Sequence, residues 1–305
     1  PLTGGRETPR AWSRPVAMTA PKVSVSADAP SGNGMLILIG AASLIVMVAG
    51  AFSCGRAGGW NGTGNGNAEG RSWGNEGCNG LTAFAIAAGC VSLVVCVIMV
   101  AGDASGGFNG CVADSRPYIG LFLVVWWVVS AAVITFAGPY TVVSNGYLGA
   151  WVACVGSVVY GMAVSSLVAQ AAGAVSGEAR KTSPAVAGLT VASAVELVAA
   201  AVFCGNCQSY VAYAVAVGAV SFFLCLVLIV GPRVSGGFAR SAPWVCLFLF
   251  LWWLAAAVVL TFISPFVYAG NGYFATWVAL ICSGVAFVES QAPGAAQVKA
   301  AAGGH

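Results

Sequence analysis

The residues of this chain that could do chemistry are few. The only histidine is His305, in the C-terminal tail, so the sequence offers no histidine-based catalytic pair or metal cluster. The nine acidic residues are scattered along the chain. No glycine pattern follows a strand and opens a helix, as phosphate- and dinucleotide-binding loops require. We therefore predict a protein that is not an enzyme and that holds no cofactor and no metal.

Glu196 is the one acidic residue inside a long apolar stretch. An ionisable side chain within a membrane helix is by default a hypothesis about function, here an ion or transport site. A structural interpretation is also open, because Glu196 lies about 10 Å of helical rise from the nearer end of its helix. From there it could reach the interface, or remain protonated against a serine or tryptophan.

Two cysteine pairs bracket predicted outer connections of the chain. Cys54 and Cys78 flank a segment rich in Gly, Asn, Trp and Ser, and we predict a disulfide that ties its ends, with two free thiols as the alternative. Cys204 and Cys207 have the spacing of a redox or metal pair. Because no histidine or further cysteine accompanies them, a local disulfide or plain thiols is the favoured interpretation. Asn61, in the first of these segments, begins an Asn-Gly-Thr pattern and is a candidate glycosylation site.

The composition indicates a membrane protein. Apolar residues make up 59% of the 305 residues and charged residues 7%, and the mean hydropathy is +0.90. A soluble domain carries about 25% charged residues, and a helix of about 20 apolar residues crosses a bilayer. The sequence therefore predicts an all-α integral membrane protein with eight transmembrane helices, at about 34–52, 81–101, 118–137, 147–168, 184–203, 210–230, 244–263 and 273–288.

The chain repeats itself, and the repeat predicts its organisation. Between 117 and 159, 19 of 43 residues recur 126 positions later. Weaker matches extend the repeat to the preceding helices. Each unit then holds four helices, so both units enter and leave on the same side, as two parallel-repeat four-helix bundles. The predicted parts are a disordered cytoplasmic tail (1–33), a first unit (34–170), a cytoplasmic linker (171–183), a second unit (184–290) and a flexible tail (291–305).

The basic residues predict the orientation. With both termini in the cytoplasm, ten basic residues fall inside and two outside, which agrees with the positive-inside rule. The inside residues are Arg6, Arg10, Arg14, Lys22, Arg116, Arg180, Lys181, Arg233, Arg240 and Lys299, and the outside ones are Arg56 and Arg71. This topology explains the net charge of +3, so we expect no nucleic-acid partner.

Aromatic residues mark corresponding points of the two units. Tryptophan pairs lie near the middle of the third helix of each unit, where we expect them to pack in the bundle core, with a sterol or ligand contact as the alternative. Tyrosine and tryptophan at the start of each fourth helix are typical of interfacial anchors. The residues are Trp126, Trp127, Tyr147 and Trp151 in the first unit, and Trp252, Trp253, Tyr273 and Trp277 in the second.

This combination resembles the MARVEL-type tetraspan proteins, such as synaptophysin, synaptogyrin and occludin relatives, with the unit occurring twice. The resemblance depends on the aromatic third helix, the Asn-Gly-Tyr segment with Trp in the fourth, and a variable first lumenal loop. It implies a role in vesicle trafficking or membrane-domain organisation in the plasma membrane or an endomembrane vesicle. The partners would be the lipid bilayer, sterols and other membrane proteins.

Two other functions stay open at this point. A channel or transporter would use Glu196 with the few hydroxyl side chains of the spans. A structural or adhesive membrane protein would use the Gly/Asn-rich outer loop. The sequence does not give the oligomeric state.

Overall fold

The computed structural model describes residues 32–56, 78–105, 109–207, 209–234 and 236–291. Within these ranges the chain is helical apart from short connections, and no strand is present. Eight of the described helices are long and apolar enough to cross a membrane. The protein is therefore all-α with eight candidate membrane spans, as the sequence predicts.

Four of the spans form a first helix group. In it α1 packs against α2 and α4, and α3 packs against α4. A short π-helical segment, η1, extends α3 and is followed by a connection to α4. The elements are α1 (Gly32–Arg56), α2 (Gly80–Ser105), α3 (Asn109–Ala132), η1 (Val133–Ala137) and α4 (Asn145–Val164).

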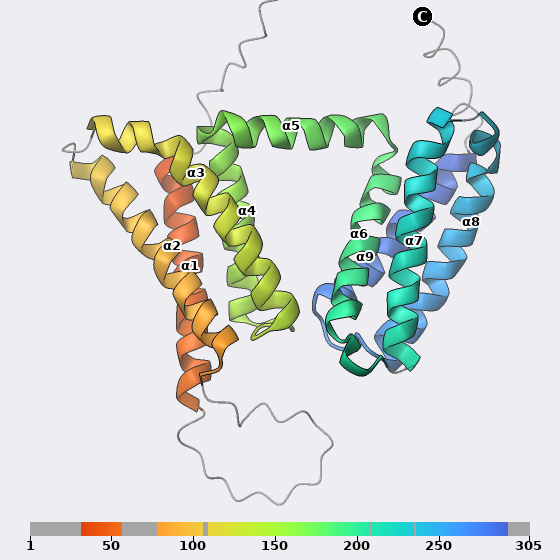
Figure 1. The fold of residues 1–305 in the computed structure, drawn as a ribbon, viewed down its shortest axis with the longest axis horizontal. Coiled ribbons are helices and arrows are strands. Elements are labelled where there is room, and N and C mark those ends of the chain that lie inside the picture. The colour runs from red at the N-terminus through yellow and green to blue at the C-terminus, as the bar shows by residue number, and fades with distance from the viewer. Residues whose placement is uncertain (1–31, 57–77, 106–108, 208, 235, 292–305) are drawn as a thin grey trace, which may run out of the picture.

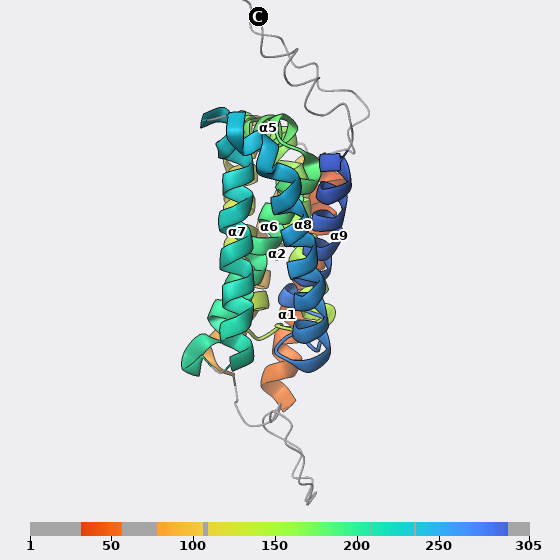
Figure 2. The same cartoon turned by 90° about the vertical axis from the view of Figure 1, so that its right-hand side faces the viewer.

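The other four spans form a second helix group with the same order of contacts, α6 against α7 and α9, and α8 against α9. A second π-helical segment, η3, extends α8. The elements are α6 (Pro184–Val202), the 3-10 turn η2 (Cys204–Asn206), α7 (Ser209–Val234), α8 (Gly236–Val258), η3 (Val259–Ile263) and α9 (Asn271–Gln291). The two groups lie side by side, with their spans running along one direction (Figures 1 and 2).

A separate helix, α5 (Ser166–Lys181), connects the two groups. The predicted span 147–168 is too long, because the backbone of Ser165 is extended and ends α4 at Val164. The predicted linker is itself helical and crosses from α4 to α6 along one edge of the molecule (Figure 1). Leu167 and Val175 of α5 are 59% and 72% exposed. A helix that carries apolar side chains across the ends of the spans fits the membrane interface.

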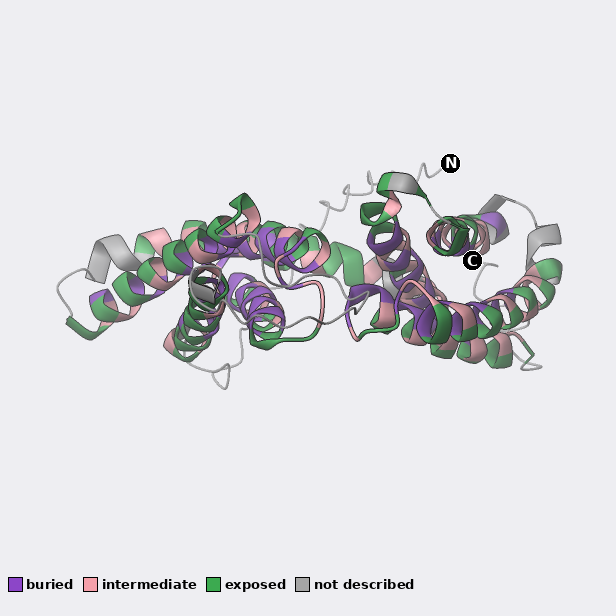
Figure 3. Ribbon diagram, turned by 90° about the horizontal axis from the view of Figure 1, so that it is seen from below, coloured by how far each residue is buried: buried purple, intermediate pink, exposed green. Residues whose placement is uncertain are grey.

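Each group has its own apolar core. Trp127 is completely buried at the centre of the first and Trp253 at the centre of the second. Viewed along the spans, the buried stretches gather where helices face one another and the exposed stretches lie outside (Figure 3). Many large apolar side chains of the spans are exposed, such as Ile37, Val97 and Ile281. This pattern suits helices whose outer surface faces lipid rather than water.

Local geometry recurs at positions 126 residues apart. The peptide bonds before Pro139 and Pro265 are both cis. The amide of Tyr140 donates to the carbonyl oxygen of Ile134, and the amide of Phe266 donates to that of Leu260, each over 2.9 Å. The connections that follow η1 and η3 are therefore built alike, although their side chains differ.

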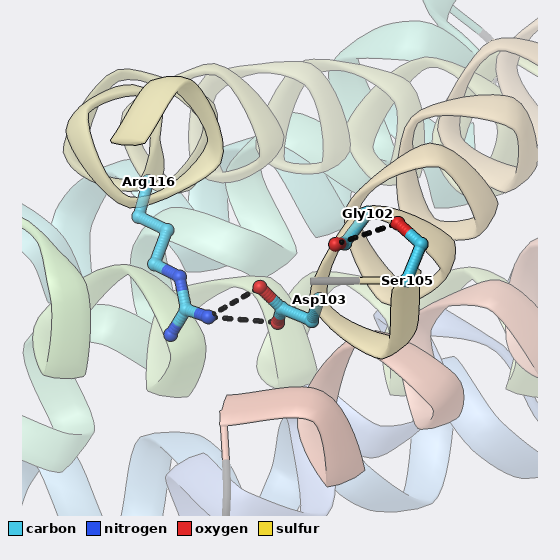
Figure 4. A network of polar contacts seen from close by, with 4 residues as sticks. All are labelled: Gly102, Asp103, Ser105 and Arg116. Carbon is cyan, nitrogen blue, oxygen red and sulfur yellow. Dashed lines mark hydrogen bonds and ion pairs between the residues drawn. The ribbon is translucent and has the colours of Figure 1, made fainter. Parts of the chain in front are cut away.

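Covalent and ionic links lie at opposite ends of the spans. Disulfides join Cys54 to Cys78 between α1 and α2, and Cys204 to Cys207 between α6 and α7. The ends of α1, α2, α6 and α7 that these disulfides join lie at the edge opposite α5 (Figure 1). At the other end of α2, Nη2 of Arg116 lies 2.6 and 2.7 Å from the carboxylate oxygens of Asp103, which ties α3 to α2 (Figure 4).

Candidate functional site at the seam between the two helix groups

The two groups meet in a contact that we call the seam: η1, residues 138–147 and Trp151 of the first group against α6 and residues 269–278 of the second. Its centre is Asn271, which is 7% exposed. The amide nitrogen of Asn271 donates to the carbonyl oxygen of Thr135 over 3.1 Å and to its hydroxyl over 3.0 Å. The phenol of Tyr147 donates to the amide oxygen of Asn271 over 2.8 Å. One amide side chain thus bridges two elements of the other group.

The backbones of the two groups also touch at the seam. The amide of Val143 donates to the carbonyl oxygen of Ala269 over 2.8 Å. Next to this bond, a Cβ atom on Gly270 would lie 2.4 Å from the carbonyl oxygen of Thr141. Only glycine allows so close an approach. The connections after η1 and η3 therefore lie against each other, and glycine is required at position 270, where their backbones approach most closely.

Two hollows adjoin the seam. The smaller, 180 Å³, is lined by residues of both groups, among them Thr135, Phe136 and Asn271. The larger, 620 Å³, is an apolar groove between α4, α6 and α9, with Tyr147, Trp151 and Asn271 on its wall. Phe136 packs against the core of the second group. The seam therefore combines a polar centre with apolar surroundings, which is an arrangement that suits helix association.

Glu196 belongs to α6, on the second group's side of the seam. Its side chain is completely buried, and one of its oxygens accepts a hydrogen bond from the hydroxyl of Thr276 over 3.1 Å. That hydroxyl also donates to the carbonyl oxygen of Gly272 over 2.9 Å. The other oxygen of Glu196 has no hydrogen-bond partner among the described residues. The carboxyl group of Glu196 is therefore buried inside the protein and does not reach the membrane surface at either end of its helix. Its hydrogen-bond partner is a threonine.

The paired tryptophans differ in their hydrogen bonds. In the first group the indole of Trp127 donates to Ser92 over 2.8 Å and that of Trp126 donates to the carbonyl oxygen of Ala88 over 3.1 Å. The indole nitrogens of Trp252 and Trp253 have no partner among the described residues. The two groups therefore share the aromatic packing but not the polar contacts of their cores.

The expected interfacial aromatics occupy different surroundings. The ring centroids of Tyr147 and Trp151 are 6.5 Å apart, and those of Tyr273 and Trp277 are 6.4 Å apart. Tyr147 is 6% exposed and belongs to the seam. Tyr273 is half-buried. The structure thus gives Tyr147 a contact between the groups, which the sequence interpretation as an anchor did not include.

The cysteine predictions agree with the geometry. Cys54 and Cys78 are 4.5 Å apart at Cα, and Cys204 and Cys207 are 4.4 Å apart, and both pairs are bonded. Among the described residues, no group of three or more His, Cys, Asp or Glu side chains could hold a metal ion. Asn61, the candidate glycosylation site, lies outside the described residues.

Tyr140 fixes the connection after η1 to the inside of the first group. Its phenol donates to the carbonyl oxygen of Val46 over 3.0 Å, and burial raises the pKa of Tyr140 to about 12. The phenol therefore stays neutral at physiological pH and keeps its proton for this bond. The corresponding residue of the second group is Phe266, which packs without a hydroxyl.

Sequence reasoning missed the seam. Thr135, Tyr147 and Asn271 stand out in the repeat, but their partners at Thr261, Tyr273 and Asn145 are the same residue types. The signal that distinguishes the two sets is Gly270, where the first unit has Ser144.

A comparison of the chain with protein-family models, curated proteins and solved structures finds no match.

Proposed function

We propose that this protein is a non-catalytic multi-pass membrane protein that organises membrane domains or vesicle traffic by lateral packing with lipid and protein. In this proposal both termini lie in the cytoplasm, and the connections that carry the disulfides lie outside. The outer connections then lie where disulfides persist. The resemblance to MARVEL-type tetraspans points to the same kind of role.

The observation that carries the proposal is how polar groups are distributed over the described spans. Hydrogen-bonding side chains such as Ser43, Ser92 and Asn271 are buried within a group or at the seam, and many large apolar side chains of the spans are exposed. Helices in lipid associate through close packing and hydrogen bonds between them. A molecule built in this way offers a broad apolar surface for lipid and for other membrane helices.

The test is the distribution of a fluorescently tagged chain in living cells, together with its rate of lateral diffusion. The proposal predicts concentration in discrete membrane domains or vesicles and diffusion slower than that of a single-span control. Asn271→Ala, which removes the polar bridge of the seam, is the test variant. Asn145→Ala removes the same type of side chain from an exposed position and is the control. Uniform distribution with free diffusion of the wild-type chain would contradict the proposal.

One observation favours a second candidate function, transport through the second group. A completely buried carboxyl group with an oxygen that lacks a partner, as at Glu196, is uncommon in a membrane span. The test is flux of protons and monovalent cations in proteoliposomes that hold wild-type protein, Glu196→Gln or Glu196→Ala. Equal background flux in all three removes transport, and wild-type flux lost in both variants supports it.

A further inference from the structure

Three polar atoms in the interior of the second helix group have no hydrogen-bond partner among the described residues. They are Oε1 of Glu196, Oγ of Ser221 and Nε1 of Trp253, which belong to α6, α7 and α8. All three side chains are completely buried. Each buried polar atom without a partner costs about 1–3 kcal/mol. Three of them within one group of four helices therefore point to a polar ligand.

The first helix group shows how the same positions pair when no carboxyl group is present. Ser92 and Trp127 hold the places that Ser221 and Trp253 hold in the second group. The indole of Trp127 donates to Oγ of Ser92 over 2.8 Å, and the hydroxyl of Ser43 lies 2.9 Å from the same oxygen. The first group thus satisfies its serine and its tryptophan with its own side chains, whereas the second group does not.

Glycine contacts fix which residues of the two groups correspond. A Cβ atom on Gly89 would lie 3.0 Å from the backbone nitrogen of Met47, and one on Gly218 would lie 2.7 Å from that of Leu197. In both groups a serine follows this glycine by three residues on the same helix. The residue before Met47 is a valine, and the residue before Leu197 is Glu196. The carboxyl group is therefore an addition that only the second group carries.

The hydrogen bonds of Thr276 indicate that Glu196 carries a proton. The hydroxyl of Thr276 lies near two acceptors, the carbonyl oxygen of Gly272 at 2.9 Å and Oε2 of Glu196 at 3.1 Å, but it has only one proton. The hydroxyls of Thr135 and Thr261 donate to the carbonyl oxygen four residues earlier, which is the position of Gly272 relative to Thr276. The contact with Glu196 then needs the proton of the carboxyl group.

The surroundings of Glu196 also favour its neutral form. A carboxylate buried in a span is costly unless a cation or several donors compensate its charge. No ion pair to Glu196 is present among the described residues, and Oε1 receives no hydrogen bond there. A metal cation would not fit the unpaired groups, because the indole N–H of Trp253 is a donor and cannot be a ligand.

We propose that the interior of the second helix group is a proton-binding site, in which Glu196 holds an exchangeable proton and Ser221 and Trp253 bind the water that exchanges it. A buried water makes about three hydrogen bonds to otherwise unpaired polar groups. Here it meets an acceptor, a hydroxyl and a donor. This inference goes beyond lateral packing, and it names the proton as the ion for the second candidate function.

The exchange step needs no reactant besides water. In D₂O the O–H bond of the Glu196 carboxyl group breaks and an O–D bond forms, while the proton leaves as HOD. The carboxyl group is neutral before and after the step. The rate of this exchange therefore reports how readily water reaches the site.

The test is infrared spectroscopy of the purified full chain in lipid vesicles at neutral pH. We expect a carbonyl band of a protonated carboxylic acid that shifts on transfer to D₂O and is absent from Glu196→Gln. Labelling the wild-type glutamate carboxyl groups with ¹³C should shift the same band, which assigns it without a substitution. Absence of the band from the wild-type chain would show that Glu196 is charged and would overturn the inference.

Matched variants in the two groups test the water site. Ser221→Ala and Trp253→Phe should each slow the shift of the Glu196 band in D₂O by roughly fivefold, as expected for the loss of one hydrogen bond to water. Ser92→Ala and Trp127→Phe remove the corresponding groups from the first group and should leave the rate unchanged. Equal rates in all four variants would remove the water site.

Proton flux in proteoliposomes separates this inference from the second candidate function. A Glu196 band that exchanges while the flux stays at background supports a proton-binding site that does not transport. Wild-type flux without the band contradicts the neutral carboxyl group.

Discussion

The phenol oxygen of Tyr147 lies 2.8 Å from the amide oxygen of Asn271, although the two residues are 124 positions apart and belong to different helix groups. This bond, with the two bonds from Asn271 to Thr135, holds the groups together at the edge opposite α5. The protein is therefore linked at both edges, covalently through α5 and non-covalently through the seam.

Removal of the Asn271 amide should loosen the seam without unfolding either group. We expect Asn271→Ala to lower the free energy of unfolding by about 1–3 kcal/mol, because Thr135 and Tyr147 lose their buried partner. Thermal unfolding in a mild detergent measures the change, with Asn145→Ala as the exposed control. A loss of stability as large in the control would contradict the assignment.

A side chain at Gly270 should open the seam from the backbone side. Gly270→Ala puts a methyl group 2.4 Å from the carbonyl oxygen of Thr141, and relief of this overlap costs about 1–3 kcal/mol. Gly173→Ala in α5 is the matched control, since a Cβ atom there meets nothing within 4 Å. The measurement is thermal unfolding in a mild detergent. Equal stability of Gly270→Ala and Gly173→Ala would refute the close approach.

The two disulfides should differ in their contribution to stability. The bond between Cys54 and Cys78 closes a separation of 24 residues, and that between Cys204 and Cys207 a separation of 3. Loop-closure entropy gives about 3 kcal/mol for the longer loop and roughly half of that for the shorter. Cys54→Ser with Cys78→Ser should therefore lower the melting temperature more than Cys204→Ser with Cys207→Ser. The reverse order would contradict this explanation.

Stability should fall at high pH through Tyr140. Burial raises the pKa of Tyr140 from 10.0 to about 12. Between these values the unfolded chain loses the phenolic proton and the folded chain keeps it, so the free energy of unfolding decreases as pH rises. Tyr140→Phe, which copies the residue at Phe266, should remove this part of the decrease. Unfolding curves at pH 9 to 12 measure it, and an identical slope in both proteins would show that Tyr140 does not contribute.

The sequence predicts the spans well because the physics of a span is local. A run of about 20 apolar residues must be helical in lipid, since its backbone groups have no other hydrogen-bond partners. For this reason predicted and observed spans agree closely, apart from the overrun at 165–168. The overrun arose at Ser165, where an extended backbone redirects the chain into α5, and apolar residues continue on both sides of that turn.

The seam could not be predicted because it depends on contacts that local sequence does not encode. Asn145 and Asn271 share the same local sequence, Asn-Gly-Tyr, and yet one is exposed and the other is 7% exposed. Which of the two asparagines is buried depends on how the two helix groups pack against each other. Glu196 illustrates the same limit, since its partner Thr276 is 80 residues away.

The most direct test of the account is the sidedness of single engineered cysteines, labelled in intact cells by a membrane-impermeant maleimide. Val143 and Tyr268 lie in the connections after η1 and η3, and Gly173 lies in α5. The account predicts that cysteines at 143 and 268 are labelled from outside, above the background of the unsubstituted chain, and that cysteine at 173 is labelled only after permeabilisation. Labelling of 143 and 268 from opposite sides, or of 173 from outside, would contradict it.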